Sequence, residues 1–437
     1  MMPERITIVG AGLGGSLMAV LLGREGARVE VLERRLDPRQ AGAEAGRSIN
    51  LALSERGLHA LGQVGLADRV LEQAVQLRGR MVHGVEGRLR FQAYGRQGQC
   101  INSVSRADLN TTLLDAAEQA SGVRIRFGQR CLDADLENAT VSVEDVRTGA
   151  REQVAADLLI GADGAFSAVR RPMQRGDRCD YSQQYLAHGY KELTIPALAG
   201  GGHQLDPNAL HIWPRGGFMM MAMANRDGSF TGTLYLPFDG ANGFDAIRTE
   251  DDLRRFFRAQ FADAMPLLPN LGEQYFANPT GSLVTVRTAP WHVAGRVVLL
   301  GDAAHAVVPF YGQGANASFE DCLVLAECLR GEPDRTRALA DYQARRQPNT
   351  DALADLAVEN FLEMRDKVAS PVFRLKKRFE KLLHALFPRW FVPLYTMVSF
   401  TRIPYAVARA RAARQWRWVW RVLGAAVGIV ALLLILS

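Results

Sequence analysis

A glycine-rich loop near the N-terminus constrains the fold of this 437-residue chain more than any other feature. The apolar segment Ile6–Val9 is typical of a β-strand, and Leu13–Glu25 has the composition of a helix. Between them lies the run from Gly10 to Gly15, Gly-Ala-Gly-Leu-Gly-Gly, and a second strand is predicted over Arg28–Leu32. Glycines at this point let backbone N–H groups at a helix N-terminus approach a pyrophosphate. The segment therefore predicts a βαβ unit that binds a dinucleotide.

An acidic residue, Glu33, ends the second predicted strand. A carboxylate at this position accepts hydrogen bonds from ribose hydroxyls, although an isolated acid at a strand end is also common on protein surfaces. Arg34 and Arg35 follow it, and they suit either a ribose 2′-phosphate or the outer phosphates of an adenosine. The glycine loop and Glu33 together strengthen the prediction of a dinucleotide site.

Two later turns each place an acid after an apolar strand. Asp163 follows the segment 157–161 and Asp302 follows 296–300, so both strands are expected to bring a carboxylate near the cofactor. A second glycine-containing loop, Gly312–Asn316, opens a helix predicted over Ala317–Leu329. The free N–H groups at that helix end would stabilise negative charge on a cofactor ring.

The middle of the chain has a different texture. Successive strand-like runs from His188 to Phe238, broken by Gly, Pro and Asn, predict a mostly antiparallel sheet. The five cysteines are scattered and form no CxxC pair, so neither a disulfide framework nor a zinc site is indicated. Near Arg296 the α/β pattern resumes, and helical periodicity dominates from Pro333 onward.

The glycine loop, the Asp163-Gly164 turn and the segment from Gly301 to His305, Gly-Asp-Ala-Ala-His, resemble in their order the class A flavin monooxygenases. The resemblance implies an α/β fold: a Rossmann-type FAD-binding domain interleaved with a mostly antiparallel β-sheet substrate domain, plus a helical C-terminal region. It also implies FAD as the tightly bound cofactor, and NAD(P)H used without a second dinucleotide domain. The predicted division is 1–175 FAD-binding with an inserted substrate hairpin near 78–95, 176–290 substrate sheet, 291–332 return to the FAD-binding domain, 333–415 helical cover of the substrate pocket, and 416–437 membrane-anchoring tail.

Longer blocks of sequence resemble one family within this class, the kynurenine 3-monooxygenases. They are Gly46–Gly57, Arg78–His83, Asp180–Pro196, Leu210–Gly216, Gly301–Asn316, Glu359–Val368 and Pro393–Ile403. The resemblance implies that NADPH and O2 are consumed and that L-kynurenine is hydroxylated to 3-hydroxy-L-kynurenine, a step of tryptophan degradation toward quinolinate and NAD. No side chain is expected to act as an acid or base, because the amino group of the substrate activates the ring, and His305 is expected to be structural.

The residue pattern of a predicted hairpin agrees with an amino-acid substrate. Its strands turn at Glu86-Gly87, which places Arg80 roughly opposite Tyr94. A guanidinium fork and a phenol suit a carboxylate, although a surface arginine packed over an aromatic ring has the same pattern. The resemblance makes Arg80 and Tyr94 a carboxylate clamp. It adds the substrate contacts Asn360 and Tyr395, with Phe238, Pro309 and Phe310 as the apolar wall and Met221 and Met223 as weaker candidates.

The resemblance also implies the residues that contact FAD. Asp302 is expected at the ribityl or pyrophosphate region, Arg106 at the pyrophosphate, and the Gly312–Asn316 loop along the flavin ring. Ala315 departs from the family, which commonly has Met there, so packing on the flavin is expected to be looser. The full predicted set is Gly10, Gly12, Leu13, Gly14, Gly15, Leu32, Glu33, Arg34, Arg35, Ala52, Arg106, Cys131, Asp302, Gly312, Gly314, Ala315 and Asn316.

The C-terminal tail predicts membrane attachment. Between Arg365 and Arg421 there are 14 Lys and Arg and two acids, and the apolar run Val422–Leu436 follows. Three tryptophans, Trp416, Trp418 and Trp420, lie at this junction, which favours a lipid surface over nucleic acid. Fifteen helical residues span roughly 22 Å, so crossing a core of roughly 30 Å would need residues from Trp418 on. The preceding positive charge would keep the catalytic body on the cytoplasmic side.

Alternatives stay open at this point. The last helix could instead pack on the enzyme or on a second subunit, as in a homodimer. The enzyme could hydroxylate another anthranilate-like or phenolic acid. A protein of another class, a binding protein that keeps this fold without redox chemistry, would resemble the Rab GDP dissociation inhibitors and would carry no flavin. No metal and no nucleic-acid partner are expected.

Overall fold

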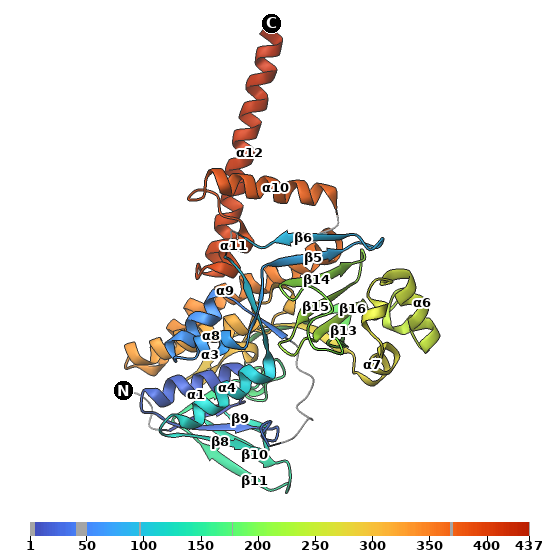
Figure 1. Cartoon of the computed structure of the whole chain (residues 1–437). Coiled ribbons are helices and arrows are strands. Elements are labelled where there is room, and N and C mark those ends of the chain that lie inside the picture. Colours follow the sequence, from blue (N-terminus) through green and yellow to red (C-terminus); the bar gives the residue numbers. More distant parts are fainter. Residues whose placement is uncertain (1–4, 41–49, 96–97, 177, 368–369, 437) are drawn as a thin grey trace.

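The computed structural model describes residues 5–40, 50–95, 98–176, 178–367 and 370–436. Its N-terminal part contains a six-stranded sheet of order β18-β19-β12-β1-β2-β8 (Figure 1). All neighbouring strands pair in parallel except β18, which is antiparallel to β19. The predicted strand–helix–strand start is confirmed. The strands are β1 (Arg5–Val9), β2 (Arg28–Glu33), β8 (Val123–Phe127), β12 (Leu158–Gly161), β18 (His292–Val293) and β19 (Val297–Leu299).

Three helices pack around this sheet: α1 (Leu13–Arg24), α4 (Arg106–Gln119) and α8 (Gly314–Gly331). Nearly every residue of α1 is buried, which explains why it reads as apolar on all sides rather than amphipathic. The core that these elements share is aliphatic, with Leu17 and Leu159 fully buried. The sheet therefore presents its strand ends as a rigid edge.

A second, seven-stranded sheet has the order β17-β13-β16-β15-β14-β5-β6. Its neighbouring strands are antiparallel except for β14 and β5, so the predicted mostly antiparallel sheet is present. The predicted hairpin is the β5–β6 pair, and it extends this same sheet. The strands are β5 (Gly79–His83), β6 (Leu89–Ala93), β13 (Asp180–Ile195), β14 (Ala209–Pro214), β15 (Met219–Ala224), β16 (Phe230–Pro237) and β17 (Gly281–Ala289).

The two faces of the seven-stranded sheet have separate cores. One face packs under α6 (Glu250–Gln260) and α7 (Leu271–Ala277), with residues such as Leu234 and Phe257 buried between them. The other face meets C-terminal helices and the 308–311 segment, where Tyr235 and Phe361 belong to one cluster. A substrate pocket on this second face would be covered by the C-terminal helices.

Smaller elements complete the fold. The strands β3 (Asn50–Leu53), β4 (Val75–Leu77) and β7 (Ile101–Ser105) form one small sheet, and β9 (Gln129–Asp135), β10 (Thr140–Asp145) and β11 (Arg151–Ala155) form another. The short helices α2 (Glu55–Gln63) and α3 (Ala67–Glu72) lie between β3 and β4, and α5 (Arg170–Met173) lies between β12 and β13.

The C-terminal region is helical, as predicted. It comprises α9 (Arg335–Leu362), a π-helical turn (Glu363–Lys367), α10 (Pro371–Leu386), α11 (Leu394–Phe400) and α12 (Tyr405–Leu436). The first half of α12 packs on α9 and buries Tyr405 and Ala408. Its second half projects away from the body (Figure 1). The alternative of a last helix packed on the enzyme thus holds for the beginning of α12.

The predicted membrane-anchoring tail gains no support from the helices of the structure. Within the described residues, every helix is too short or too polar to cross a membrane. A tail that spans the bilayer is therefore not supported. Trp418 and Trp420 are nonetheless 50% and 66% exposed at the point where α12 leaves the body.

Candidate active site

A single continuous cavity of about 780 Å³ joins the two sheets. Because β1, β2, β12 and β19 are parallel, their carboxyl ends meet at one edge, and the residues that follow them line one end of the cavity. The other end lies between the seven-stranded sheet and the C-terminal helices. One end of the cavity therefore lies where parallel sheets bind dinucleotides, and the other, called the enclosed end below, lies under the C-terminal helices.

The glycine loop is shaped by close backbone contacts. A Cβ atom at Gly10, whose φ is +103°, would lie 2.5 Å from the Ala162 carbonyl oxygen, and one at Gly15 would lie 1.9 Å from the Gly10 oxygen. A Cβ at Gly12 would meet nothing within 4 Å, and Gly12 lines the cavity. Gly10 and Gly15 thus allow the chain to pack on itself, whereas Gly12 leaves room for a ligand. Gly15 itself does not line the cavity, and its predicted cofactor contact stays a prediction.

Glu33 is 5% exposed and lies at the edge of the cavity. One carboxylate oxygen accepts a hydrogen bond from the Ala11 N–H at 2.8 Å, and the other accepts from the Arg35 N–H at 2.9 Å. The Arg35 Nε also donates to the second oxygen at 3.0 Å. The acid thus links the glycine loop to β2, and the oxygen that accepts from Ala11 has room for one further donor. Nearby, burial raises the pKa of Cys131 to about 12, so its thiol is neutral at this end.

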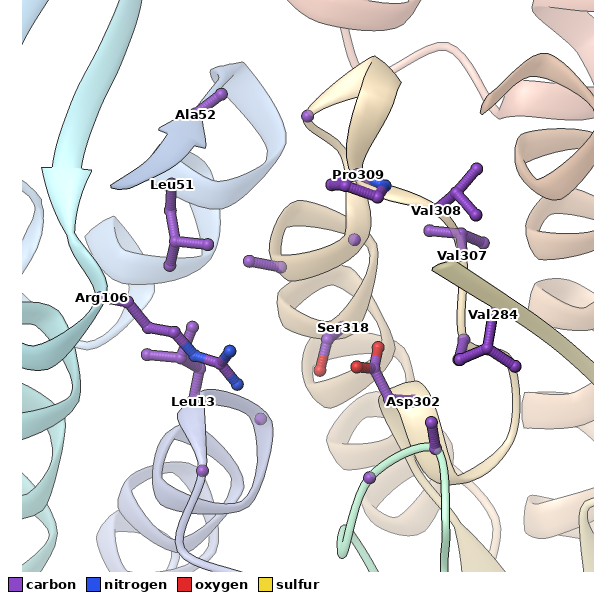
Figure 2. A pocket seen from close by; sticks show the side chains of 18 of the residues that line it. Leu13, Leu51, Ala52, Arg106, Val284, Asp302, Val307, Val308, Pro309 and Ser318 are labelled. Atoms are coloured by element: carbon purple, nitrogen blue, oxygen red, sulfur yellow. The ribbon is translucent and has the colours of Figure 1, made fainter. Parts of the chain in front are cut away.

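Asp302 and Arg106 lie on opposite walls of the same end (Figure 2). Protein surrounds the Asp302 carboxyl, and this burial raises its pKa, while His305 and Arg106 oppose the rise. The side chain of Asp302 is open to the cavity. An acid that faces a cation across a cavity can accept from sugar hydroxyls while the cation binds phosphate.

The second helix N-terminus also points at the cavity. Gly312 adopts a left-handed conformation with φ of +65°, and α8 begins at Gly314, three residues earlier than predicted. Gly314 and Ala315 line the cavity. Asn316 does not; its side chain donates to the carbonyl oxygens of Ala52 at 2.8 Å and Gly312 at 2.9 Å. These bonds hold the loop in place, and the predicted cofactor contact of Asn316 stays a prediction.

These features fit an FAD molecule. The glycine cradle that a Cβ would fill, two helix N-termini and an acid at each sugar position match a pyrophosphate flanked by two sugars. All the other residues predicted to contact FAD also line the cavity: Gly10, Gly12, Leu13, Gly14, Leu32, Glu33, Arg34, Arg35, Ala52, Arg106, Cys131, Asp302, Gly312, Gly314 and Ala315.

An arginine surrounded by phenols lies at the enclosed end. The Arg80 guanidinium carbon is 5.6 Å from the centre of the Tyr94 ring and 5.1 Å from that of Tyr395. The Tyr395 ring stacks on Tyr94 at 5.3 Å and on Tyr311 at 5.7 Å between ring centres. Arg80 pairs with Gln92 in the hairpin, so the predicted pairing with Tyr94 was off by two residues. The two side chains still meet because diagonal neighbours share a face of the sheet.

The charge of Arg80 is incompletely satisfied by the protein. Its Nε is buried and has no hydrogen-bond partner among the described residues. Burial opposes the charged form, but Tyr395, Tyr94 and Glu363 outweigh it and raise the pKa of Arg80, while burial raises the pKa of Tyr94 and Tyr395. A fixed cation beside neutral phenol donors is suited to bind a carboxylate.

The walls of the enclosed end are mostly apolar and aromatic. The predicted Pro309 and Phe310 line it, as do Met221 and Met223. Phe238 does not; its ring packs near Phe244, 6.3 Å between centres. The cavity-facing residues of β16 are odd-numbered, and Phe238, which directly follows the strand, continues the opposite face. Its predicted substrate contact stays a prediction. The cavity residues that sequence reasoning missed here are Tyr190, Thr231, Thr233, Tyr235, Tyr311 and Met364.

Asn360 supports the wall rather than forming it. It is 6% exposed and does not line the cavity, and its side chain donates to the Phe310 carbonyl oxygen at 2.6 Å. Its predicted substrate contact stays a prediction, and the structure shows its contact with Phe310. His305 is likewise structural: its Nε2 lies 2.6 Å from the Asp321 carboxylate, which also binds Arg346 at 2.6 Å.

Comparisons with known proteins agree with this geometry. A family model described as an FAD binding domain matches residues 4–357. The chain is 49% identical over 406 residues to a kynurenine 3-monooxygenase of Myxococcus xanthus, which covers 93% of this chain and 88% of that protein. It is 49% identical over 432 residues to one of Salinispora tropica, with 98% and 95% covered. One of Dictyostelium discoideum is 46% identical over 418 residues, with 92% and 90% covered.

Solved structures show the same fold at lower identity. A 2-methyl-3-hydroxypyridine-5-carboxylic acid oxygenase superposes with a TM-score of 0.69 at 22% identity, covering 85% of this chain and 95% of that one. PqsL of P. aeruginosa, solved with 2-aminobenzoylacetate, gives a TM-score of 0.64 at 22% identity, covering 83% and 97%. At these identities the two structures bear on the fold alone.

Proposed function

Since the chain belongs to the family of kynurenine 3-monooxygenases, we propose that one end of its cavity binds the cofactor and the other binds the substrate. The enzyme is an FAD-dependent monooxygenase that hydroxylates kynurenine with NADPH and O2. The observation that supports the division most directly is the buried Arg80, whose Nε has no partner in the described part of the chain and which lies at the end remote from the glycine loop.

In this proposal the glycine-loop end holds FAD. Gly12 and the N-terminus of α1 receive the pyrophosphate together with Arg106. Glu33 accepts from the adenosine ribose, Asp302 accepts from the sugar chain next to the flavin, and the N-terminus of α8 faces the flavin ring. Bound FAD supplies the redox chemistry by which NADPH and O2 are consumed.

The enclosed end holds L-kynurenine. Arg80 binds the carboxylate through both oxygens, and the hydroxyls of Tyr94 and Tyr395 donate to the same group. Phe310, held in place by Asn360, and Pro309 pack on the aromatic ring and orient it toward the flavin position. Apolar and aromatic walls exclude water from the reacting ring. This arrangement assigns no acid or base to the protein, in keeping with a substrate whose own amino group activates the ring.

The decisive experiment is product identification. Purified enzyme incubated with L-kynurenine, NADPH and oxygen is expected to yield 3-hydroxy-L-kynurenine in amounts that match the NADPH consumed. Flavin reduction by NADPH, followed spectrally, should be faster with L-kynurenine than with another anthranilate-like or phenolic acid. Equal acceleration by such an acid would favour the related hydroxylase instead, and a colourless protein without flavin would favour a non-catalytic binding protein.

The domain division stays a proposal as well. Residues 1–175 and 291–332 form the FAD-binding part, 176–290 the substrate sheet, 333–415 the helical cover and 416–437 the tail. The hairpin near 78–95 belongs to the first segment by sequence, and its pairing with β14 supports grouping it with the substrate sheet in space.

We also propose that the tail attaches to a membrane surface without crossing it. Exposed Trp418 and Trp420 beside Arg417 and Arg421 support this, because such residues favour lipid headgroups. Deleting the residues after Arg414 is expected to move the enzyme from the membrane fraction to the soluble fraction. Trp418→Ala with Trp420→Ala should weaken sedimentation with anionic vesicles while leaving the FAD content unchanged. If the truncated chain still sediments with membranes, the tail is not the site of attachment.

A further inference from the structure

One polar side chain in the cavity is not used by the assignments above. Ser318 lies on α8, one turn after its first residue, and is 8% exposed. It lines the FAD end of the cavity, and Figure 2 shows it beside Asp302, facing the side from which Arg106 and Leu13 approach. Its hydroxyl makes no hydrogen bond with any residue that the structure describes. A serine within a helix either bonds to a carbonyl of the preceding turn or points away from the helix, and the Ser318 side chain lines the cavity.

The surroundings of the hydroxyl are built from glycines. A Cβ atom at Gly14 would lie 2.4 Å from the Ser318 Oγ, and one at Gly301 would lie 2.5 Å from it. Both distances are shorter than real contacts, so a side chain at either position would force the Ser318 hydroxyl to turn away from its present place. The N-terminal turn of α1, the turn before Asp302 and the wall of α8 thus meet around this one oxygen.

We propose that the Ser318 hydroxyl donates a hydrogen bond to the FAD pyrophosphate, at the phosphate that rests on the N-terminus of α1. The inference rests on the FAD site proposed above and adds a donor to it. A phosphate oxygen accepts only, so it needs donors, and Asp302 beside Ser318 supplies none when ionised. Gly14 lies in the first turn of α1, where a phosphate-binding loop could present a hydroxyl of its own, but it has no side chain. Ser318 supplies that hydroxyl from the neighbouring helix.

The proposal makes positions 14 and 318 interdependent. A side chain at 14 and the hydroxyl at 318 compete for the same volume, so only one of them can occupy it. Either one would place an oxygen between α1 and α8 at the edge of the cavity. A serine at position 14 is therefore expected to replace the serine at position 318 as the hydrogen-bond donor.

Titration of the apoenzyme with FAD, followed by quenching of flavin fluorescence, tests the donor. Ser318→Ala is expected to weaken FAD binding about tenfold, because a hydrogen bond to a charged group is lost. Ser229→Ala is the matched control: Ser229 is 9% exposed, lies in the turn before β16 and does not line the cavity, so it should leave the FAD affinity unchanged. Thermal unfolding of the apo forms separates loss of affinity from loss of fold.

A pair of further variants tests the interdependence. Gly14→Ser alone should weaken FAD binding because it collides with Ser318. Gly14→Ser combined with Ser318→Gly should restore binding toward the wild-type value, a non-additive result that a double-mutant cycle measures. An unchanged affinity in Ser318→Ala overturns the hydrogen bond, and additive losses in the double variant overturn the interdependence. If wild-type apoenzyme itself bound no FAD, the site assignment rather than the role of Ser318 would be wrong.

Discussion

Gly12→Ala is expected to give a folded enzyme that has lost its flavin. A Cβ at Gly12 meets no protein atom within 4 Å, so the apoenzyme should unfold at nearly the wild-type temperature. The same methyl group projects into the cavity where the pyrophosphate must approach the backbone. We expect FAD affinity, measured by fluorescence quenching, to fall by at least about 100-fold, which corresponds to roughly 2.8 kcal/mol.

Two other glycines provide the comparison. Gly15→Ala should lower both the FAD affinity and the unfolding temperature, because its Cβ would lie 1.9 Å from the Gly10 oxygen. Gly62→Ala, in α2 with no contact closer than 4.0 Å, should change neither property adversely. A Gly12→Ala enzyme that purifies yellow, with full flavin content, would show that the pyrophosphate does not pass over this residue.

Arg80→Met is expected to remove most of the preference of the enzyme for a substrate that carries a carboxylate. Charge-assisted hydrogen bonds contribute roughly 1.5–3 kcal/mol each, and a tenfold change corresponds to about 1.4 kcal/mol. We therefore expect kcat/KM for L-kynurenine to fall about 100-fold, chiefly through KM, since the guanidinium lies away from the reacting ring. The kcat/KM of Arg80→Lys should lie between those of the wild type and Arg80→Met, because lysine keeps the positive charge but lacks the two-pronged guanidinium.

The control for this prediction is the nearby Arg78. Arg78 is exposed and does not line the cavity. Its backbone oxygen accepts a hydrogen bond from the Tyr94 N–H, and this bond does not depend on the side chain. Arg78→Met should therefore leave KM unchanged. An analogue of kynurenine without the carboxylate should be turned over equally well by wild-type and Arg80→Met enzymes. If Arg80→Met instead lowers the rates for both compounds to the same degree, Arg80 positions the cavity wall rather than the carboxylate.

Features set by local chemistry could be predicted from the sequence. The glycine loop, the acid at Glu33 and the strand ahead of Asp302 depend on residues close together in the chain, and the structure places them as expected. The alternating runs after His188 likewise predicted an antiparallel sheet. The site residues that line the cavity were mostly found through the resemblance, because Arg80 and Tyr94 alone also suit a surface pair.

Features set by long-range pairing could not be predicted in this way. No local signal indicates that β5 lies parallel to β14 or that the hairpin pairs two residues out of the expected register. Phe238 looked like a ring-packing residue by type, but its parity along β16 directs it away from the cavity. That parity was readable, and applying it would have selected Thr233 and Tyr235 instead.

The distribution of the pocket along the chain has a consequence for biosynthesis. Arg80 comes from an early hairpin, Asp302 and α8 from the last strand and helix of the FAD-binding part, and Tyr395 from α11. Domains fold as they leave the ribosome, from the N-terminus onward. The elements of the proposed FAD site are thus all present once α8 has emerged, whereas Tyr395, the further phenol beside the Arg80 and Tyr94 clamp, waits for α11. A translation product that stops between the two would retain the elements of the cofactor site while lacking the aromatic ring stacked beside Arg80.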